Sequence, residues 1–482
     1  MASVSSEIPS PDNEPLSGKN ALEPLQFYGG ALGALAPFIF FVTGVIIIAL
    51  FGAPDERGFW PILIFALSIG LLLARDRQRF CQTVVTGMSQ EIVMIMIAAW
   101  MLASIIGSLM TVTGLVEALT WLASQLNLGG VAFVLAAFVI CCIVSLSTGS
   151  SFATILICAP LLYPVGGALG AHLPTLAGAI LGGATFGDCI APISDTTIAS
   201  ALSQQAAIGA SVRSRLKYVI PAGLIAVLLY FLSASVSENG AVTDAQNIAG
   251  NPDGLPMILV PGLIIFLFLR GKHLIHGLLF GLLFGAALGL SLSLLPLEKL
   301  LSLDLQNFTA RSFIIDGMNR AVGIGFFTIL LMGLVATLQQ SGLFDRLVNF
   351  AAQYSKTAKQ AEFWISGTVG AAVLLTTHSI VAILTVGEFV RKTGKKAGVE
   401  KLRRANLLSL IVCVFPFLLP YFIPVILMAN ATTAGVESGT PSVSPLAVGL
   451  HNFVAWGLLM MTAIALFFGF GRKSEKKEKA RV

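Results

Sequence analysis

Charge is scarce in this chain of 482 residues. Only 11% of the residues are Asp, Glu, Lys or Arg, whereas a soluble domain carries roughly 25%. Hydrophobic residues make up 56% of the chain, and the mean hydropathy is +0.88. Most of the chain therefore needs an apolar solvent, which excludes a soluble enzyme and indicates a protein of the lipid bilayer.

Signals for secretion, metal binding and nucleic-acid binding are also missing. The opening residues MASVSSEIPSPDNEPLSGKN are polar and net acidic, so they lack the basic region and short apolar core of a signal peptide. We interpret 1–29 as a disordered cytoplasmic tail. The six cysteines lack metal-binding spacing and lie mostly in apolar runs. The net charge of +5 comes from loops and from the tail 471–482, so no nucleic-acid partner is predicted.

Long charge-free runs predict helices that cross the bilayer. No Asp, Glu, Lys or Arg occurs between residues 118 and 187, and a crossing needs about 20 apolar residues. The alternating pattern of a transmembrane β-barrel is not seen. We therefore predict an all-α polytopic membrane protein. The expected spans are 30–51, 60–74, 91–113, 129–147, 152–169, 175–200, 218–236, 255–269, 274–296, 319–338, 361–375, 378–390, 405–430 and 446–470.

The basic residues predict the orientation of these spans. If the N-terminus is cytoplasmic, nearly all Lys and Arg fall in inside connections, above all in the run 391–404 and in the C-terminal tail. The exceptions are Arg57, Lys299, Arg311 and Arg320. Because basic loops stay in the cytoplasm, both termini are predicted to face it. No Arg or Lys is predicted within the membrane core.

An internal repeat appears when the chain is aligned with itself. One register without gaps aligns TGLVEALTWLASQ (113–125) with SGLFDRLVNFAAQ (341–353), and it also pairs Thr148 with Thr376 and Ser151 with Ser379. Under the predicted topology, the spans before the two aligned segments cross in opposite directions. The repeats are therefore inverted, an architecture typical of secondary transporters.

The repeat also predicts how the chain is divided. Two pairs of spans, 129–147/152–169 and 361–375/378–390, are each either two crossings or a re-entrant hairpin whose tip lies beside a site. The predicted segments are N-terminal helices at 30–85, a first repeat at 86–236, a linker loop and helices at 237–300, a second repeat at 301–470 and a basic cytoplasmic tail at 471–482.

The densest polar cluster within a predicted span is GDCIAPISDTT at 187–197. Gly187 and Pro192 weaken the helix there and leave backbone groups free. Asp188 and Asp195 supply negative charge, and hard cations such as Na⁺ prefer oxygen ligands. A carboxylate that binds either Na⁺ or a proton exchanges one for the other. An alternative is that these residues cap two half-helices, with Asp195 as an N-cap. The candidate ligands are Asp188, Ser194, Asp195, Thr196 and Thr197.

The tips of the two predicted hairpins are polar as well. LSTGSSFAT (146–154) offers hydroxyls, and its counterpart LTTHSIVA (375–382) adds His378. His378 is either a buried neutral side chain or a proton carrier, because histidine titrates near neutral pH. Glu388 is predicted to pair with Arg391 and Lys392 at the interface. The candidate tip residues are Thr148, Ser150, Ser151, Thr376, His378 and Ser379.

The repeat counterpart of the Asp cluster is FPFLLPYFIPV at 415–425. Pro416, Pro420 and Pro424 break the helix there, but the segment contains no acid. The predicted site is therefore asymmetric and weighted toward the first repeat. Glu91, Glu117 and Arg320 lie at predicted span ends, where contact with the headgroups accounts for them.

TGSSFAT (148–154) and GDCIAPISDTT (187–197) together resemble the signature of the NhaC family of Na⁺/H⁺ antiporters, within the ion transporter superfamily. The resemblance implies an exchanger of the bacterial inner membrane. It also implies an ion site at Asp188, Ser194, Asp195, Thr196 and Thr197, with Thr148, Ser150 and Ser151 opposite. Cys189 and Ala191 depart from the family, whose members often have a basic residue and a serine at these positions. Asp188 would then be less neutralised.

The prediction is Na⁺ or Li⁺ exchange for H⁺ by alternating access, with both ions competing at Asp188 and Asp195. The partners are the bilayer, Na⁺ and H⁺, a homo-oligomer is compatible with the sequence, and no cofactor is expected beyond the transported ions. The alternative is a carrier, coupled to Na⁺ or H⁺, for a small organic anion or amino acid. An enzyme is not expected, because an intramembrane aspartyl protease needs facing carboxylates about 3 Å apart. A channel fits the asymmetric inverted repeat less well than a carrier.

Overall fold

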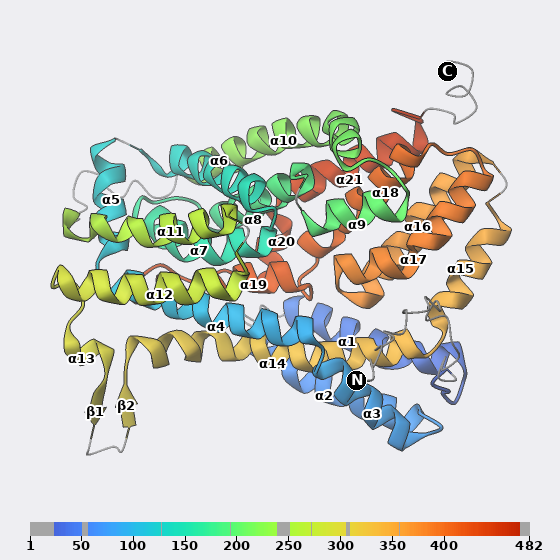
Figure 1. The fold of residues 1–482 in the computed structure, drawn as a ribbon, viewed down its shortest axis with the longest axis horizontal. Coiled ribbons are helices and arrows are strands. Elements are labelled where there is room, and N and C mark those ends of the chain that lie inside the picture. The colour runs from blue at the N-terminus through green and yellow to red at the C-terminus, as the bar shows by residue number, and fades with distance from the viewer. Residues whose placement is uncertain are drawn as a thin grey trace, which may run out of the picture.

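The computed structural model describes residues 24–50, 56–126, 128–192, 194–238, 251–270, 272–304, 309–355 and 357–472. Most of the predicted tail 1–29 and most of the tail 471–482 lie outside these ranges. Within them the protein is an elongated bundle of helices (Figure 1). Eight of the helices in these ranges are long and apolar enough to cross a membrane. The predicted all-α polytopic fold is confirmed.

The N-terminal helices and the first repeat follow in chain order. The N-terminal helices are α1 (Ala31–Leu50), α2 (Phe59–Leu73), which follows the short 3₁₀ turn η1 (Glu56–Gly58), and α3 (Arg77–Met88). The first repeat comprises α4 (Glu91–Val112), α5 (Leu115–Gln125), α6 (Gly130–Thr148), α7 (Ser151–Ala168), α8 (Leu173–Ile190), α9 (Asp195–Ser203) and α10 (Ile208–Glu238).

A linker of short elements leads to the second repeat. The linker comprises η3 (Pro252–Ile258), α11 (Leu259–Leu269), α12 (Leu274–Ser291), α13 (Leu297–Leu300) and the antiparallel strands β1 (Ser302–Asp304) and β2 (Thr309–Arg311). The second repeat comprises α14 (Phe313–Gln340), α15 (Leu343–Gln353), α16 (Ala358–Thr376), α17 (Ser379–Lys396), α18 (Lys401–Val412), η4 (Phe415–Phe417), α19 (Ile423–Ala431), η5 (Thr432–Ser438), α20 (Pro445–Leu450) and α21 (Phe453–Phe467).

The helix boundaries confirm the internal repeat. In the register that aligns the two sequences, the pairs α5/α15, α6/α16, α7/α17 and α9/α19 each begin and end at matching positions, and α8 and α18 begin at matching positions. The structure therefore keeps this register through every element that surrounds the hairpin tips and the broken helices.

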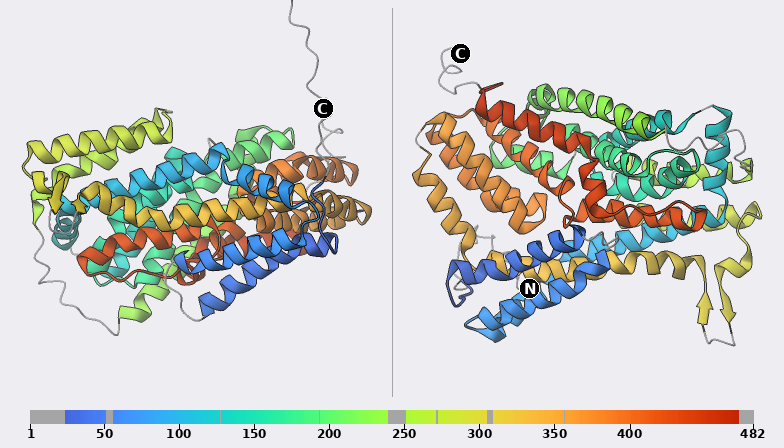
Figure 2. Two further views of the ribbon diagram at one scale, coloured as in Figure 1. Left: turned by 90° about the horizontal axis from the view of Figure 1, so that it is seen from below. Right: turned by 180° about the vertical axis from the view of Figure 1, so that it is seen from behind.

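Packing of α4 against α14 shows that the repeats are inverted. Gly317 and Gly325 of α14 lie against Ile105 and Ile97 of α4 in that order, and Gly333 lies against Met88 at the end of α3, just before α4 begins. The two helices therefore run antiparallel, side by side along the molecule (Figure 2). Because α4 and the main part of α14 occupy the same place in their repeats, the two halves have opposite directions.

Both pairs of spans with uncertain topology are helical hairpins. A Cβ placed on Gly130, at the start of α6, would lie 2.8 Å from the Cα of Ala171, just beyond α7, so this hairpin returns to the end from which it started. In the second hairpin, Ile365 near the start of α16 lies against Gly394 near the end of α17. The tips of both hairpins line one cavity together with the broken helices, which is the position that the re-entrant interpretation predicts for them.

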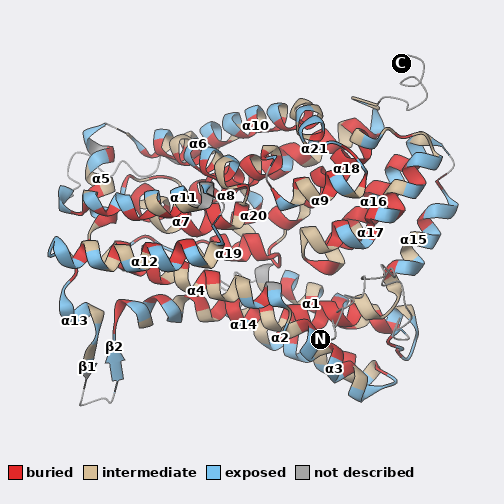
Figure 3. Ribbon diagram, viewed as in Figure 1, coloured by how far each residue is buried: buried red, intermediate tan, exposed pale blue. Residues whose placement is uncertain are grey.

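The core lies where the repeats meet. Nearly all of α8 is buried, whereas α13 and the β1–β2 hairpin are mostly exposed (Figure 3). Glu91 and Glu117 are exposed near the N-terminal ends of α4 and α5, as predicted. Glu388 also pairs as predicted, with 2.8 Å between its Oε1 and Nζ of Lys392 and 3.8 Å to Nη2 of Arg391.

Two arginines that the sequence placed in cytoplasmic connections are buried in helices inside the protein. Helix α10 begins at Ile208 rather than at 218, which brings Arg215 into a helix where its side chain is fully buried. Helix α18 begins at Lys401 rather than at 405, which buries Arg403 beside Glu362, with 3.1 Å between Nη2 and Oε2. The predicted topology places these basic residues in loops. A buried arginine is nevertheless stable when its guanidinium contacts a buried carboxylate or the C-terminal end of a helix.

Arg320 also lies further inside than predicted. Because α14 begins at Phe313, Arg320 sits in the second turn of this helix and is half-buried. Its carbonyl accepts a hydrogen bond of 3.0 Å from Nδ2 of Asn430, so this part of α14 contacts the broken helix of the second repeat.

Candidate functional site

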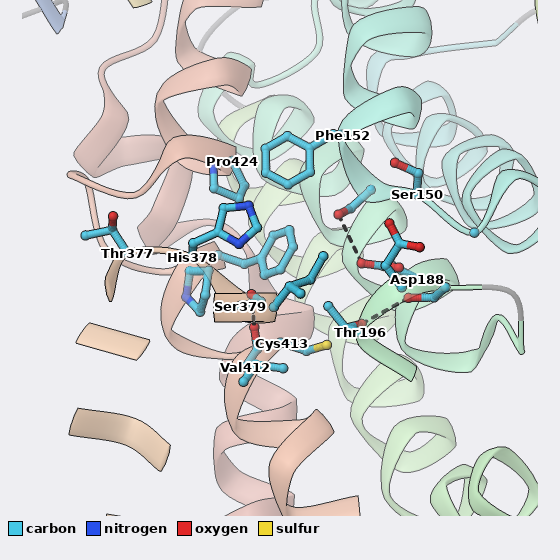
Figure 4. Close-up of a pocket in the computed structure, with 17 residues that line it drawn as sticks. Ser150, Phe152, Asp188, Thr196, Thr377, His378, Ser379, Val412, Cys413 and Pro424 are labelled. Carbon is cyan, nitrogen blue, oxygen red and sulfur yellow. Dashed lines mark hydrogen bonds between the residues drawn. The ribbon is translucent and has the colours of Figure 1, made fainter. Parts of the chain in front are cut away.

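One cavity lies where both hairpin tips meet both broken helices (Figure 4). Its volume is about 60 Å³. The first repeat contributes Gly149, Ser150, Ser151, Phe152, Asp188, Ser194, Asp195 and Thr196, and the second contributes Thr377, His378, Ser379, Ile380, Val412, Cys413, Pro416, Phe417 and Pro424. The inverted repeat therefore brings segments from the two halves of the chain to a single site.

The first broken helix places its polar residues at this cavity. Helix α8 ends at Ile190, where the amide of Ala191 still donates to the carbonyl of Gly187 at 2.9 Å. Pro192 cannot continue the ladder because it has no N–H. Helix α9 then begins at Asp195, with Ser194 as its N-cap residue. The break therefore presents the negative end of one short helix and the positive end of another to the cavity.

Asp188 is the buried carboxylate of the site. It is 6% exposed, and its Oδ2 accepts a hydrogen bond of 3.1 Å from Oγ of Ser151 on the facing hairpin tip. Asp195 lines the same cavity and is exposed at the first position of α9. The hydroxyls of Ser194 and Thr196 lie 3.0 Å apart beside these carboxylates. The arrangement supplies several oxygens of the kind that a hard cation binds.

Three candidate residues lie behind the cavity rather than in its lining. Thr148 donates to the carbonyl of Val144 at 2.9 Å, and Thr376 makes the equivalent bond of 2.8 Å to Ala372 in the second repeat. Thr197 is fully buried on α9. These three side chains therefore stabilise the hairpin tips and the broken helix, and they do not line the cavity.

Arg215 contacts both halves of the broken helix. One of its Nη1 hydrogen bonds, of 2.8 Å, goes to the carbonyl of Cys189 at the end of α8, and another, of 2.9 Å, goes to Oγ1 of Thr197 on α9. A cation at a helix C-terminus is favourable. Position 189 lacks the basic residue that family members often have there. Arg215 of α10 supplies positive charge to this region instead.

Sequence reasoning missed Arg215 because it read residues 213–217 as a cytoplasmic loop. From the absence of a basic residue at position 189 the sequence predicted a less neutralised Asp188, although the same absence is also a signal for a cation supplied from elsewhere in the chain. That signal does not say which of the 29 basic residues supplies it.

The second repeat lines the opposite side of the cavity with mostly apolar groups. Ser379 donates to the backbone carbonyl of Val412 at 2.9 Å, and the rest of the broken helix contributes Cys413, Pro416 and Pro424 (Figure 4). The cavity is asymmetric, as the sequence indicated. The first repeat supplies the charge and the second supplies most of the apolar wall.

His378 is the polar exception on the second side. It is the N-cap residue of α17 without a side-chain capping bond, whereas Ser150 at the matching position caps α7 by accepting from the amide of Ala153 at 3.2 Å. Among the described residues, Nδ1 of His378 is buried without a hydrogen-bond partner. The ring therefore keeps an unused nitrogen beside the cavity.

The fold and the site define a class: a polytopic helical membrane protein with inverted repeats that meet at an acidic central cavity. Residues 31–235 match the family model of the Na⁺/H⁺ antiporter family. This match includes the hairpin tip and the broken helix of the first repeat. The predicted resemblance to this family is confirmed over that part of the chain.

Parts of several known antiporters are also similar to parts of this chain. The Na⁺/H⁺ antiporter NhaC of Bacillus subtilis is 36% identical over 183 residues, which are 36% of this chain and 38% of that protein. NhaC of Alkalihalophilus pseudofirmus is 28% identical over 181 residues, 36% of this chain and 37% of that protein. A malate-2H⁺/Na⁺-lactate antiporter of B. subtilis is 40% identical over 98 residues, 20% of this chain and 21% of its own. The chain thus matches less than two fifths of the length of each relative.

A solved structure of Neisseria gonorrhoeae MtrF, described as illuminating a class of antimetabolite efflux pumps, also aligns with this chain. The alignment covers 86% of this chain and 95% of MtrF, with 12% identity and a TM-score of 0.40.

Proposed function

We propose that the protein exchanges Na⁺ or Li⁺ for H⁺ across a bacterial inner membrane, by competition between the cation and the proton at Asp188 and Asp195. The observation that carries the proposal is the pair of acids at one small cavity, with Asp188 buried and bonded to Ser151. A buried carboxylate is stable when it is protonated or paired with a cation. The same group then holds one ion or the other, and exchange follows without separate machinery.

Alternating access fits the way the cavity is built. Its walls are two hairpin tips and two broken helices, one of each from either repeat. Inverted repeats of this kind move against one another about a central site. In the proposed cycle, Ser194 and Thr196 complete the cation shell, and His378 is a second group that carries a proton.

The proposed orientation places both termini in the cytoplasm. Basic residues of several predicted inside connections lie at one end of the molecule, where Arg75 and Arg346 line a common pocket and Lys217 bonds to the carbonyl of Gly471. The β1–β2 hairpin and α5 lie at the opposite end (Figure 1). Because basic loops remain in the cytoplasm, the first end faces inward in this proposal.

A second candidate is the exchange of a small organic acid, favoured by the similarity to a malate/lactate antiporter over 98 residues. Cavity size argues against it as the first choice. A volume of about 60 Å³ holds a few water molecules, at roughly 10–15 Å³ each, or a small cation. The guanidinium of Arg215 also bonds to Cys189 and Thr197 and is not part of the cavity lining.

Purified protein in vesicles that contain a pH-sensitive dye tests the proposal. A pulse of Na⁺ or Li⁺ to the wild type is expected to move protons, and Asp188→Asn is expected to abolish this signal, because an amide cannot exchange a proton for a cation. Asp345→Asn, an exposed acid on α15, is the matched control and should behave as wild type. Well-inserted wild type that takes up labelled malate or lactate, and moves no protons under Na⁺ or Li⁺, would contradict antiport.

A further inference from the structure

A second pocket lies where the C-terminal ends of α9 and α17 meet the beginning of α18. Its volume is about 330 Å³, several times that of the central cavity. Helix α17 contributes Arg391, Lys392 and Lys395 from its last turns. Lys401 and Arg404 of α18 face them, and Gln204 and Gln205 at the end of α9 complete the lining.

The lining of this pocket is strongly positive. Of the described residues that form it, five are basic and none is acidic. Two acids lie nearby: Glu388 pairs with Lys392 and Arg391 on the exposed side of α17, and Glu400 is the N-cap residue of α18. They offset part of the positive charge and leave an excess of cations around a space that the protein itself does not fill.

A fixed guanidinium forms part of the pocket wall. Arg404 is 3% exposed, its Nε donates to Oε1 of Gln204 at 3.3 Å, and its Nη1 donates to the carbonyl of Val399. Gln204 is itself held, because its Nε2 donates to the carbonyl of Gly387 at 2.9 Å. An arginine held in this way is pre-organised, so little side-chain entropy is lost when an anion binds.

We propose that this pocket binds a phosphate group, carried either by an anionic lipid or by a small phosphate in solution. A fixed arginine surrounded by flexible lysines is the side-chain set that recognises phosphate. Basic pockets between helices at the basic face of a membrane protein also receive lipid headgroups. The proposal does not depend on which ion the central cavity carries.

A bound phosphate would tie the two repeats together. Helix α9 belongs to the first repeat and begins at Asp195 in the central cavity, whereas α17 belongs to the second and begins at Ser379 in the same cavity. The basic pocket lies at the opposite ends of both helices. An anion held between these ends therefore stabilises the arrangement of α9, α17 and α18 seen in this structure.

The test is thermal unfolding of the full-length protein in detergent. Inorganic phosphate, short-chain phosphatidylglycerol and short-chain phosphatidylcholine are titrated separately at constant ionic strength, with NaCl as the reference. We expect phosphatidylglycerol, with or without inorganic phosphate, to raise Tm in a saturable way, because a ligand that binds only the folded state stabilises it. A response to both identifies the bare phosphate group as sufficient, and a response to the lipid alone identifies the headgroup with its chains. A response to inorganic phosphate alone identifies a soluble ligand.

A double variant separates the pocket from general surface charge. Lys395→Gln combined with Lys401→Gln removes two exposed lysines of the lining and is expected to weaken the binding by about tenfold or more. Lys359→Gln combined with Lys396→Gln removes the same charge from exposed positions outside the lining, and the affinity should stay within about twofold of wild type. An equal loss in both variants, no saturable rise in Tm with phosphatidylglycerol or inorganic phosphate, or an equal rise with phosphatidylcholine overturns the proposal.

Discussion

Position 188 carries a carboxylate in the first repeat, and its counterpart 416 in the second carries a proline. Ser151 and Ser379 occupy matching places at the two hairpin tips and line the same cavity. Ser151 donates to a side-chain carboxylate, whereas Ser379 donates to a backbone carbonyl freed by the broken helix. The two repeats thus share the same backbone arrangement, but the charged groups of the cavity come from the first repeat alone.

The difference teaches that a duplicated scaffold needs only one charged copy of its site. Both repeats keep the hairpin and the break, because both are needed to bring four segments to one cavity. The charge of Asp188 in the low-dielectric interior is costly, and a second buried acid facing it would add repulsion to that cost. An apolar wall from the second repeat avoids this repulsion and leaves the negative charge of the cavity on a single pair of acids.

The largest expected effect on stability comes from Arg215, which has no basic counterpart in the second repeat, where Val443 stands. Arg215→Gln removes hydrogen bonds that join α8 to α9, and a hydrogen bond to a charged group contributes about 1.5–3 kcal/mol. The free energy of unfolding should fall by about 3 kcal/mol, measured as a lower Tm in detergent.

The control for Arg215 is its neighbour Arg213, which is exposed on the same helix. Arg213→Gln removes the same charge and should leave Tm close to that of wild type, because exposed charges contribute little. If both variants melt at the same temperature, the guanidinium of Arg215 does not hold the broken helix together.

Most of the helix arrangement could be predicted from the sequence, because the repeat and the helix breaks depend on short-range sequence patterns. The repeat was visible from Thr148 and Ser151 and their counterparts, and the breaks were visible from Pro192 and Pro416. The choice between a crossing and a hairpin was not visible. Helices α6 and α7 have 19 and 18 residues, a length that suits either arrangement, so tertiary packing decides.

The electrostatic partners of the site could not be predicted from the sequence. Arg215 meets Cys189 across 26 residues of chain and Asn406 across 191, and no local pattern marks either contact. Arg403 and Glu362 are likewise 41 residues apart and belong to different helices. Buried ion and hydrogen-bond partners depend on how helices pack, whereas helix breaks depend on residues next to each other.

A smaller effect is expected when the two tip serines are compared. Ser151→Ala removes a donor to the Asp188 carboxylate, and such a bond is worth about 1.5 kcal/mol or more. The apparent affinity for Na⁺ in the vesicle assay should weaken by about tenfold. Ser379→Ala removes a donor to a neutral carbonyl and should change the affinity by no more than about twofold. Equal effects of the two variants would show that the second repeat shares in cation binding.

The smallest expected effect concerns the backbone of the two tips. Gly149 has a φ of +66° and its counterpart Thr377 has a φ of +54°, so both adopt the left-handed conformation. A residue with a Cβ loses roughly 1–2 kcal/mol there. Gly149→Ala should therefore lower the free energy of unfolding by about 1 kcal/mol. Thr377→Gly relieves the same strain while losing the hydrogen bond from Oγ1 of Thr377 to the carbonyl of Thr376, so it should destabilise by less than half as much. Tm measurements on both variants compare the tips directly, and a larger loss for Thr377→Gly would mean that its side-chain contacts outweigh the strain in holding the second tip.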